Sequence, residues 1–191
     1  MYHSFKRLID FFASLCLLLI LSPLFLVLYL AVRIESKGPA FFKQKRVGRR
    51  QRIFWIYKFR TMRIDTPRDV PTHLMDRPDK YVTKMGAFLR RFSLDEIPQL
   101  YNILKGEMSI VGPRPALWNQ FDLINIRESY NVNSIRPGLT GWAQVNGRDE
   151  LPIPVKAKFD KEYLEKESFL FDLGIIFTTA KKALAGEGIK R

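Results

Sequence analysis

Apolar residues follow one another almost without interruption near the start of the chain. Residues 8–32 form a run of 25 positions whose only charged side chain is that of Asp10. At about 1.5 Å per residue, a helix of this length can cross the roughly 30 Å hydrocarbon core of a bilayer. A cleaved signal peptide would have a shorter apolar region followed by a small-residue cleavage site. The closing sequence YLAVRIESKG offers no such site, so the pattern predicts a retained membrane anchor.

The centre of this apolar run contains a helix-breaking pair, Ser22 and Pro23. Pro23 removes the hydrogen bond that the Leu19 carbonyl would otherwise accept, and the Ser22 hydroxyl can bond back to a preceding carbonyl and sharpen the bend. Basic residues stand at both ends of the run: Lys6 and Arg7 before it, and Arg33, Lys37, Lys43, Lys45 and Arg46 after it. Because basic flanks favour the cytoplasmic side, both ends are expected there.

We therefore predict two regions. Residues 1–32 form a re-entrant membrane helix broken at Ser22-Pro23, and residues 33–191 form a second region with interfacial helices on the cytoplasmic side of the membrane. The alternative is a proline-kinked helix that spans the bilayer, since prolines are tolerated in such helices. Asp10 is expected to pair with Lys6 or Arg7 on its own helix.

The remaining pattern predicts a mainly helical α+β fold with a β-hairpin. Residues 41–62 form the hairpin, because RIFWIYKF is rich in β-branched and aromatic residues and Gly48 lies in the connection. Helices are expected at 82–92 and 94–106, and at 154–184, where apolar residues recur at broadly helical spacing with lysines between them. Prolines and glycines indicate a loop at 65–78 and irregular backbone at 112–115 and 135–148.

Charge narrows the choice of partner. The net charge is +13, and residues 33–63 hold eleven Lys or Arg against one acid, Glu35. Basic residues directly after a membrane segment favour anionic lipid headgroups over nucleic acid. A single cysteine, Cys16, excludes a disulfide framework, and two histidines, His3 and His73, are too few for a zinc cluster.

Two adjacent acids, Asp95 and Glu96, are unusual in so basic a chain. Glu96 forms a capping-box pattern with Ser93, which would give it a purely structural role. Pro98 conflicts with that register, and Asp95 is an alternative N-cap. In both registers the carboxylates lie at the positive end of a helix. The helix dipole favours their ionised forms there, the state that a nucleophile or a metal ligand requires.

Arginines on irregular backbone are candidates for binding an anionic substrate. Arg114 lies between two prolines, Arg148 follows Asn146-Gly147, and Arg136 precedes Pro137. Stiff backbone lowers the entropy lost when a guanidinium binds phosphate, although each arginine alone is more often a surface charge. The chain has no G-x-x-x-x-G-K-[ST], no G-x-G-x-x-G and no D-x-D pattern.

Three stretches carry a resemblance to a known family: KFRTM (58–62), SLDEIPQLYNILKGEMSIVGPRP (93–115) and RPGLTGWAQVNGR (136–148). Behind an apolar helix with Ser-Pro, they resemble the bacterial sugar transferases, the monotopic phosphoglycosyl transferases. The likeness covers essentially the whole chain and is closest to the minimal catalytic form of the family.

The resemblance implies transfer of a sugar 1-phosphate from a UDP-sugar to polyprenyl (undecaprenyl) phosphate, with release of UMP, as the first membrane step of surface glycan synthesis. It also implies that residues 33–191 are a catalytic domain on the cytoplasmic face of the bacterial inner membrane. It implies that Asp95 forms a covalent phosphosugar intermediate and that Glu96 helps to bind Mg²⁺ or to activate the lipid phosphate. Asp95 and Glu96 are thus also the expected metal ligands. It further implies substrate-binding roles for Lys58, Arg114, Arg148 and Asp172, beside the candidate Arg136.

Two other functions remain open on the sequence. A membrane-anchored basic protein without enzymatic activity would explain the charge but not the acid pair. A glycosyl transferase that moves the sugar alone would release UDP, and the missing D-x-D pattern weighs against it.

Overall fold

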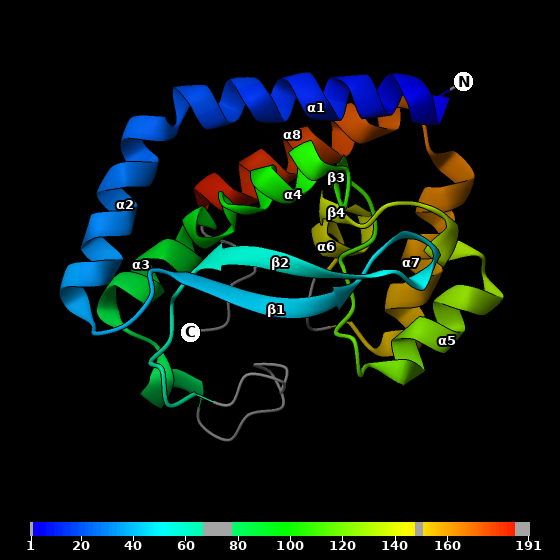
Figure 1. Cartoon of the computed structure of the whole chain (residues 1–191). Coiled ribbons are helices and arrows are strands. Elements are labelled where there is room, and N and C mark those ends of the chain that lie inside the picture. Colours follow the sequence, from blue (N-terminus) through cyan, green and yellow to red (C-terminus); the bar gives the residue numbers. More distant parts are fainter. Residues whose placement is uncertain (1, 67–77, 148–150, 186–191) are drawn as a thin grey trace.

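The computed structural model describes residues 2–66, 78–147 and 151–185, and their fold is α+β (Figure 1). The larger elements are the helices α1 (Tyr2–Ile20), α2 (Ser22–Glu35), α3 (Lys84–Arg91), α4 (Gln99–Lys105), α5 (Phe121–Ser129), α6 (Trp142–Val145), α7 (Ile153–Lys166) and α8 (Phe169–Ala185), and the strands β1 (Phe41–Val47), β2 (Ile53–Phe59), β3 (Ser109–Val111) and β4 (Gly138–Thr140). The predicted fold class is confirmed. Most of the predicted loop at 65–78 lies outside the described residues.

The predicted hairpin is β1 and β2, which pair antiparallel from Phe41 opposite Phe59 to Val47 opposite Ile53. Gly48 lies in the connection, as expected, and its amide donates to the Arg52 carbonyl at 2.8 Å. The hairpin crosses the front of the molecule beneath α1, and α4 and α8 lie behind and above it (Figure 1).

A second sheet was not predicted from the sequence. Strands β3 and β4 pair in parallel, Ser109 opposite Gly138 and Val111 opposite Thr140. Strand β4 lies in the region 135–148 that was expected to be irregular, and β3 ends directly before the one at 112–115. Glycine makes this contact possible, because a Cβ on Gly138 would lie 2.1 Å from the backbone nitrogen of Gly112. The prolines and glycines of this region therefore permit close backbone packing as well as turns.

The apolar N-terminal run forms two helices, α1 and α2, with a bend of 65° between them. The helices meet at Leu21, and the Ser22 hydroxyl donates to the Leu19 carbonyl at 2.8 Å. The hydroxyl thus satisfies the carbonyl that Pro23 leaves without its helical donor. None of the described helices is long and apolar enough to cross a bilayer alone, whereas the bent pair meets that test of length and composition.

Helix α1 turns its polar residues inward. Lys6, Asp10 and Ser14 are its buried side chains, while large apolar side chains such as Phe12 and Leu19 are exposed. The expected pairing of Asp10 with Lys6 or Arg7 is wrong: Asp10 accepts from the Ile110 amide at 3.0 Å. Desolvation explains the difference, because a buried carboxylate needs a fixed donor and the backbone of β3 supplies one.

Arg7 ties α1 to the far end of α4 by donating to the carbonyls of Ile103 and Leu104, at 2.6 and 2.7 Å. These carbonyls belong to the last turn of α4, where the helix dipole also favours a cation. The N-terminal helix is therefore fastened to the element that follows the acid pair.

Two of the buried apolar clusters contain side chains of β2. One cluster joins α2, α3 and β2 through Leu28, Val32, Phe59 and Leu89, and another joins β2 with α4 through Phe54, Ile56, Leu100 and Ile103. Burial of these side chains fixes α3 and α4 against the strand that carries Lys58.

Candidate active site

The acid pair lies in a tight turn before α4. Ser93 has a left-handed backbone (φ 54°), Leu94–Glu96 form a single 3-10 turn, and Pro98 occupies the N-cap position of α4. Ser93 makes no side-chain capping bond, and the N-cap residue of α4 is Pro98 and not Asp95. Both capping registers expected from the sequence are therefore wrong. Because the ring of Pro98 would collide with a carbonyl one turn earlier inside a helix, the α-helix begins only after it.

The predicted cations Lys58 and Arg114 meet the acid pair. Lys58 Nζ lies 2.6 Å from Glu96 Oε1 and 3.8 Å from Asp95 Oδ2, and Arg114 Nη1 lies 3.2 Å from the same oxygen of Glu96. Asp95 is 8% exposed and Glu96 7%. The structure therefore brings together four of the residues predicted from the sequence.

The electrostatics of Asp95 balance burial against nearby charge. Burial is the largest cause that raises the pKa of Asp95, and the neighbouring Glu96 raises it further, while Lys58, Arg90 and Arg114 lower it. The net direction of the pKa is upward, so the site without substrate disfavours the ionised form of Asp95. A cation bound beside Asp95, or a reaction that delocalises the carboxylate charge, lowers the desolvation cost of the ionised form.

Arg90 is a site residue that the sequence analysis missed. Its Nε donates to the Thr61 hydroxyl at 2.9 Å, and its charge acts on Asp95. Helix α3 reaches Thr61 closely because residue 86 is glycine: a Cβ there would lie 2.0 Å from the Thr61 carbonyl oxygen. Glycine inside the predicted helix 82–92 was the one signal in the sequence for this close approach.

Asn102 holds α4 against the edge of β2. Its Oδ1 accepts from the Tyr57 amide at 3.1 Å, and its Nδ2 donates to the Trp55 carbonyl at 2.7 Å. Asn102 is fully buried, and its side chain satisfies a backbone amide and a backbone carbonyl of β2 that a neighbouring strand would otherwise bind. The bond at Tyr57 fixes the backbone directly before Lys58.

Of the other three predicted residues, two are described, and neither joins this cluster. Arg136 Nε donates to the Gly106 carbonyl at 2.9 Å, so it caps the opposite end of α4. Asp172 lies on α8, where it accepts hydrogen bonds from Tyr2 and Tyr163 and pairs with Lys6. Arg148 lies outside the described residues.

Asp95 and Glu96 are also the residues that could hold a divalent cation. Within residues 2–66, 78–147 and 151–185, no group of three or more His, Cys, Asp or Glu side chains gathers in one place. Mg²⁺ commonly uses one or two carboxylates and takes its other ligands from substrate phosphates and water. The pair fits such a site, provided that the phosphates of the substrate complete it.

Two buried carboxylates beside Lys58, Arg90 and Arg114 define a site suited to a substrate that carries phosphate groups. Residues 1–186 match the family of bacterial sugar transferases. The chain therefore belongs to this family and is an enzyme, a phosphoglycosyl transferase. The resemblance found in the sequence is confirmed.

Three relatives illustrate the similarity. The chain is 41% identical to the uncharacterized sugar transferase EpsL of Bacillus subtilis (strain 168), a match that covers 97% of this chain and 90% of EpsL. It is 36% identical to the exopolysaccharide production protein ExoY of Rhizobium meliloti (strain 1021), over 96% of this chain and 87% of ExoY. It is 39% identical to the UDP-glucose:undecaprenyl-phosphate glucose-1-phosphate transferase of Escherichia coli (strain K12), over 95% of this chain and 40% of that protein.

Proposed function

We propose that this enzyme transfers a sugar 1-phosphate from a UDP-sugar to polyprenyl phosphate, such as undecaprenyl phosphate, and releases UMP. The observation that carries the proposal is the buried Asp95-Glu96 pair in contact with Lys58 and Arg114. Family membership and the name of the Escherichia coli relative support the choice of substrates. The product would be a polyprenyl-diphosphate-linked sugar for surface glycan synthesis.

The proposed reaction has two displacements at the β-phosphorus of the donor. A carboxylate oxygen of Asp95 forms a bond to this phosphorus, and the bond to the bridging oxygen of the diphosphate breaks, so that UMP leaves. A phosphate oxygen of the lipid then attacks the same phosphorus and releases Asp95. A carboxylate nucleophile divides one difficult step into two easier ones, and burial makes Asp95 a less stabilised ground-state anion.

The cations near the acid pair are placed to balance the charge of this reaction. Lys58 and Arg114 share one oxygen of Glu96. Exchange of these contacts for phosphate oxygens would bring both cations onto the substrate without a large movement. Charge that develops on the leaving UMP oxygen is stabilised by such fixed donors.

Mg²⁺ is part of the proposal, with Asp95 and Glu96 as its protein ligands. When bound, the ion would neutralise charge on the diphosphate and reduce its repulsion by Asp95. Once Lys58 and Arg114 bind phosphate oxygens, Glu96 would help to hold the ion or would activate the lipid phosphate as a base.

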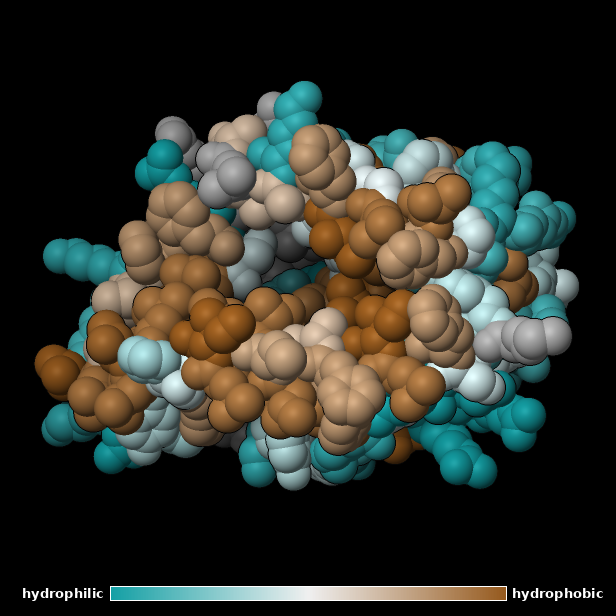
Figure 2. Space-filling model, turned by 90° about the horizontal axis from the view of Figure 1, so that it is seen from above, coloured by the Kyte–Doolittle hydropathy of each residue, from teal (hydrophilic) through white to brown (hydrophobic). Residues whose placement is uncertain are grey.

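We also propose that α1 and α2 enter the cytoplasmic face of the inner membrane as a re-entrant pair. Figure 2 shows apolar side chains gathered on the face of the molecule that carries α1, around a hollow. Helix α8 also carries exposed apolar side chains: Leu170 is 78% exposed and Phe177 74%. A helix whose polar side faces the protein and whose apolar side faces outward is suited to lipid. The basic residues that follow α2 are suited to anionic headgroups, whereas Lys6 and Arg7 bind groups of the protein itself.

The experiment is turnover of detergent-solubilised protein with Mg²⁺, undecaprenyl phosphate and a panel of UDP-sugars. We expect UMP together with a lipid-linked sugar for at least one donor. Release of UDP instead would identify a transferase that moves the sugar alone. No nucleotide product from any donor would contradict the proposal.

A further inference from the structure

The loop that carries Arg114 is held through its carbonyl groups. Four consecutive carbonyls accept from different elements: Pro113 from the Gly138 amide, Arg114 from Arg127 Nη1, Pro115 from Arg46 Nη1 and Ala116 from the Val47 amide, at 2.9, 2.9, 3.0 and 2.9 Å. Prolines on both sides of Arg114 stiffen this segment. The carbonyl of Arg114 itself depends on a side chain, that of Arg127.

Arg127 is fixed by a buried ion pair. Its Nε and Nη2 both donate to Asp160 Oδ2, at 2.9 and 2.6 Å, so that α5 and α7 are joined. Arg127 is 4% exposed and Asp160 1%. Burial raises the pKa of Asp160, and the charge of Arg127 opposes this change.

Stability alone does not account for this ion pair. Helices α5 and α7 already pack through apolar residues, with Leu123, Ile124 and Ala157 in one buried cluster. Desolvation of two charges largely cancels their attraction, and apolar replacements of such pairs are often neutral or stabilising. What an apolar pair could not supply is the third hydrogen bond, from Nη1 to the Arg114 carbonyl.

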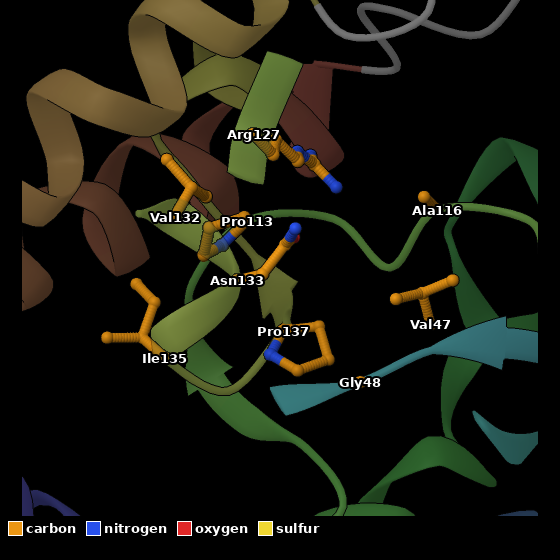
Figure 3. A pocket seen from close by; sticks show the side chains of 9 residues that line it. All are labelled: Val47, Gly48, Pro113, Ala116, Arg127, Val132, Asn133, Ile135 and Pro137. Carbon is orange, nitrogen blue, oxygen red and sulfur yellow. The ribbon is translucent and has the colours of Figure 1, made fainter. Parts of the chain in front are cut away.

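Arg127 reaches the loop beside a small pocket. Figure 3 shows the Arg127 side chain reaching into a pocket lined by Val47 and Gly48 at the end of the hairpin and by Pro113 and Ala116 of the loop. Ala116 is held by packing in the buried cluster with Leu123 and Ala157, whereas the Arg114 carbonyl is held by the directional bond from Arg127.

We propose that Arg127 and Asp160 are positioning residues of the transferase: the pair fixes the backbone of Arg114 and so keeps its guanidinium beside Glu96. The proposal rests on the proposed function, because it assigns a role in turnover to a contact outside the acid cluster. Misplacement of a substrate-binding group by about 1 Å can cost roughly 100-fold in rate. Loss of the pair should therefore reduce kcat/KM by about 10–100-fold.

The test compares the parent with the double variant Arg127→Met/Asp160→Leu. We expect this variant to remain folded, with a Tm near that of the parent, and to show faster amide hydrogen exchange in residues 112–118 but not in α1. UMP release should fall by the factor given above. In an Arg114→Ala background the double replacement should have no further effect on kcat/KM, because the residue that it positions is gone.

Two further variants complete the design. Lys161→Gln/Glu165→Gln removes an exposed ion pair on the same helix, α7, and should change neither exchange nor turnover. Arg127→Lys keeps a cation beside Asp160 but lacks the fork that reaches two partners. This variant replaces the apolar double variant if that one does not fold. It should show the same faster amide exchange in residues 112–118, and its effect on kcat/KM should likewise vanish in the Arg114→Ala background.

Each outcome decides a separate claim. Unchanged exchange in the loop would overturn the positioning role even if no substrate were ever turned over. An active parent with an equally active variant, or with losses that add to that of Arg114→Ala, would overturn this inference alone. A parent that releases no UMP while its loop responds as expected would overturn the proposed function and leave the role of the pair in fixing the loop supported.

Discussion

Replacement of Asn102 by alanine tests how the site is assembled. The side chain satisfies the Tyr57 amide and the Trp55 carbonyl of β2 and also donates to Glu107 Oε2 at 2.7 Å. Each of these two backbone groups costs about 1–3 kcal/mol when left without a partner, so Asn102→Ala should lower the free energy of unfolding by about 2–6 kcal/mol. Turnover should fall as well, because β2 carries Lys58 and α4 follows the acid pair.

The assay is denaturant unfolding in detergent, followed by tryptophan fluorescence, with UMP release measured on the same preparations. Asn102→Asp keeps the acceptor for Tyr57 but loses the donor to Trp55 and places a carboxylate beside Glu107, so it should destabilise at least as much. Asn146→Ala removes an exposed bond to the Trp142 carbonyl and should cost less than about 0.5 kcal/mol. A loss below about 1 kcal/mol for Asn102→Ala would refute the reasoning.

Three other variants test separate parts of the account. Because burial holds the folded pKa of Asp95 above its unfolded value of 3.8, its ionised form opposes folding at neutral pH. Asp95→Asn should therefore raise Tm at neutral pH, and the gain over the parent should shrink as the pH falls toward 3.8. A difference in Tm that does not change with pH would contradict this reasoning. Gly86→Ala should cost about 1–3 kcal/mol through its clash with Thr61, whereas Gly174→Ala, with open space around it, should not. Ser22→Ala/Pro23→Leu should straighten the membrane anchor and move the N-terminus to the outer side of the membrane. In a chain without Cys16, a cysteine at position 2 should then react with an impermeant thiol reagent on intact cells only in this variant.

Local chemistry explains how much of the fold the sequence predicts. The bend at Ser22-Pro23 and the hairpin around Gly48 depend on residues adjacent in the chain, and both are confirmed. The parallel pairing of β3 with β4 depends on backbone approach between Gly112 and Gly138, 26 positions apart, which no local pattern encodes. The start of α4 was misplaced because two acids near Ser93 suggested a cap, while the ring of Pro98 determined the register.

The same distinction holds for the site. Lys58, Asp95, Glu96 and Arg114 were predicted as a group through the resemblance, and the structure brings them into contact. Arg90 and Arg127 were missed because arginines are common in this chain and only tertiary structure shows which of them face the acids or the loop. Arg136 was predicted as a phosphate ligand from its proline-flanked position, yet its guanidinium binds the end of α4, where the helix dipole favours a cation.

The covalent intermediate on Asp95 tests the central claim most directly. The parent protein is incubated with a UDP-sugar labelled at the β-phosphorus, with Mg²⁺ and without polyprenyl phosphate, and is then denatured. We expect the label to stay on the parent, to be absent from Asp95→Asn, and to leave the parent when undecaprenyl phosphate is added before denaturation. Equal labelling of both proteins, or UMP release by the parent without retained label, would contradict a mechanism through Asp95.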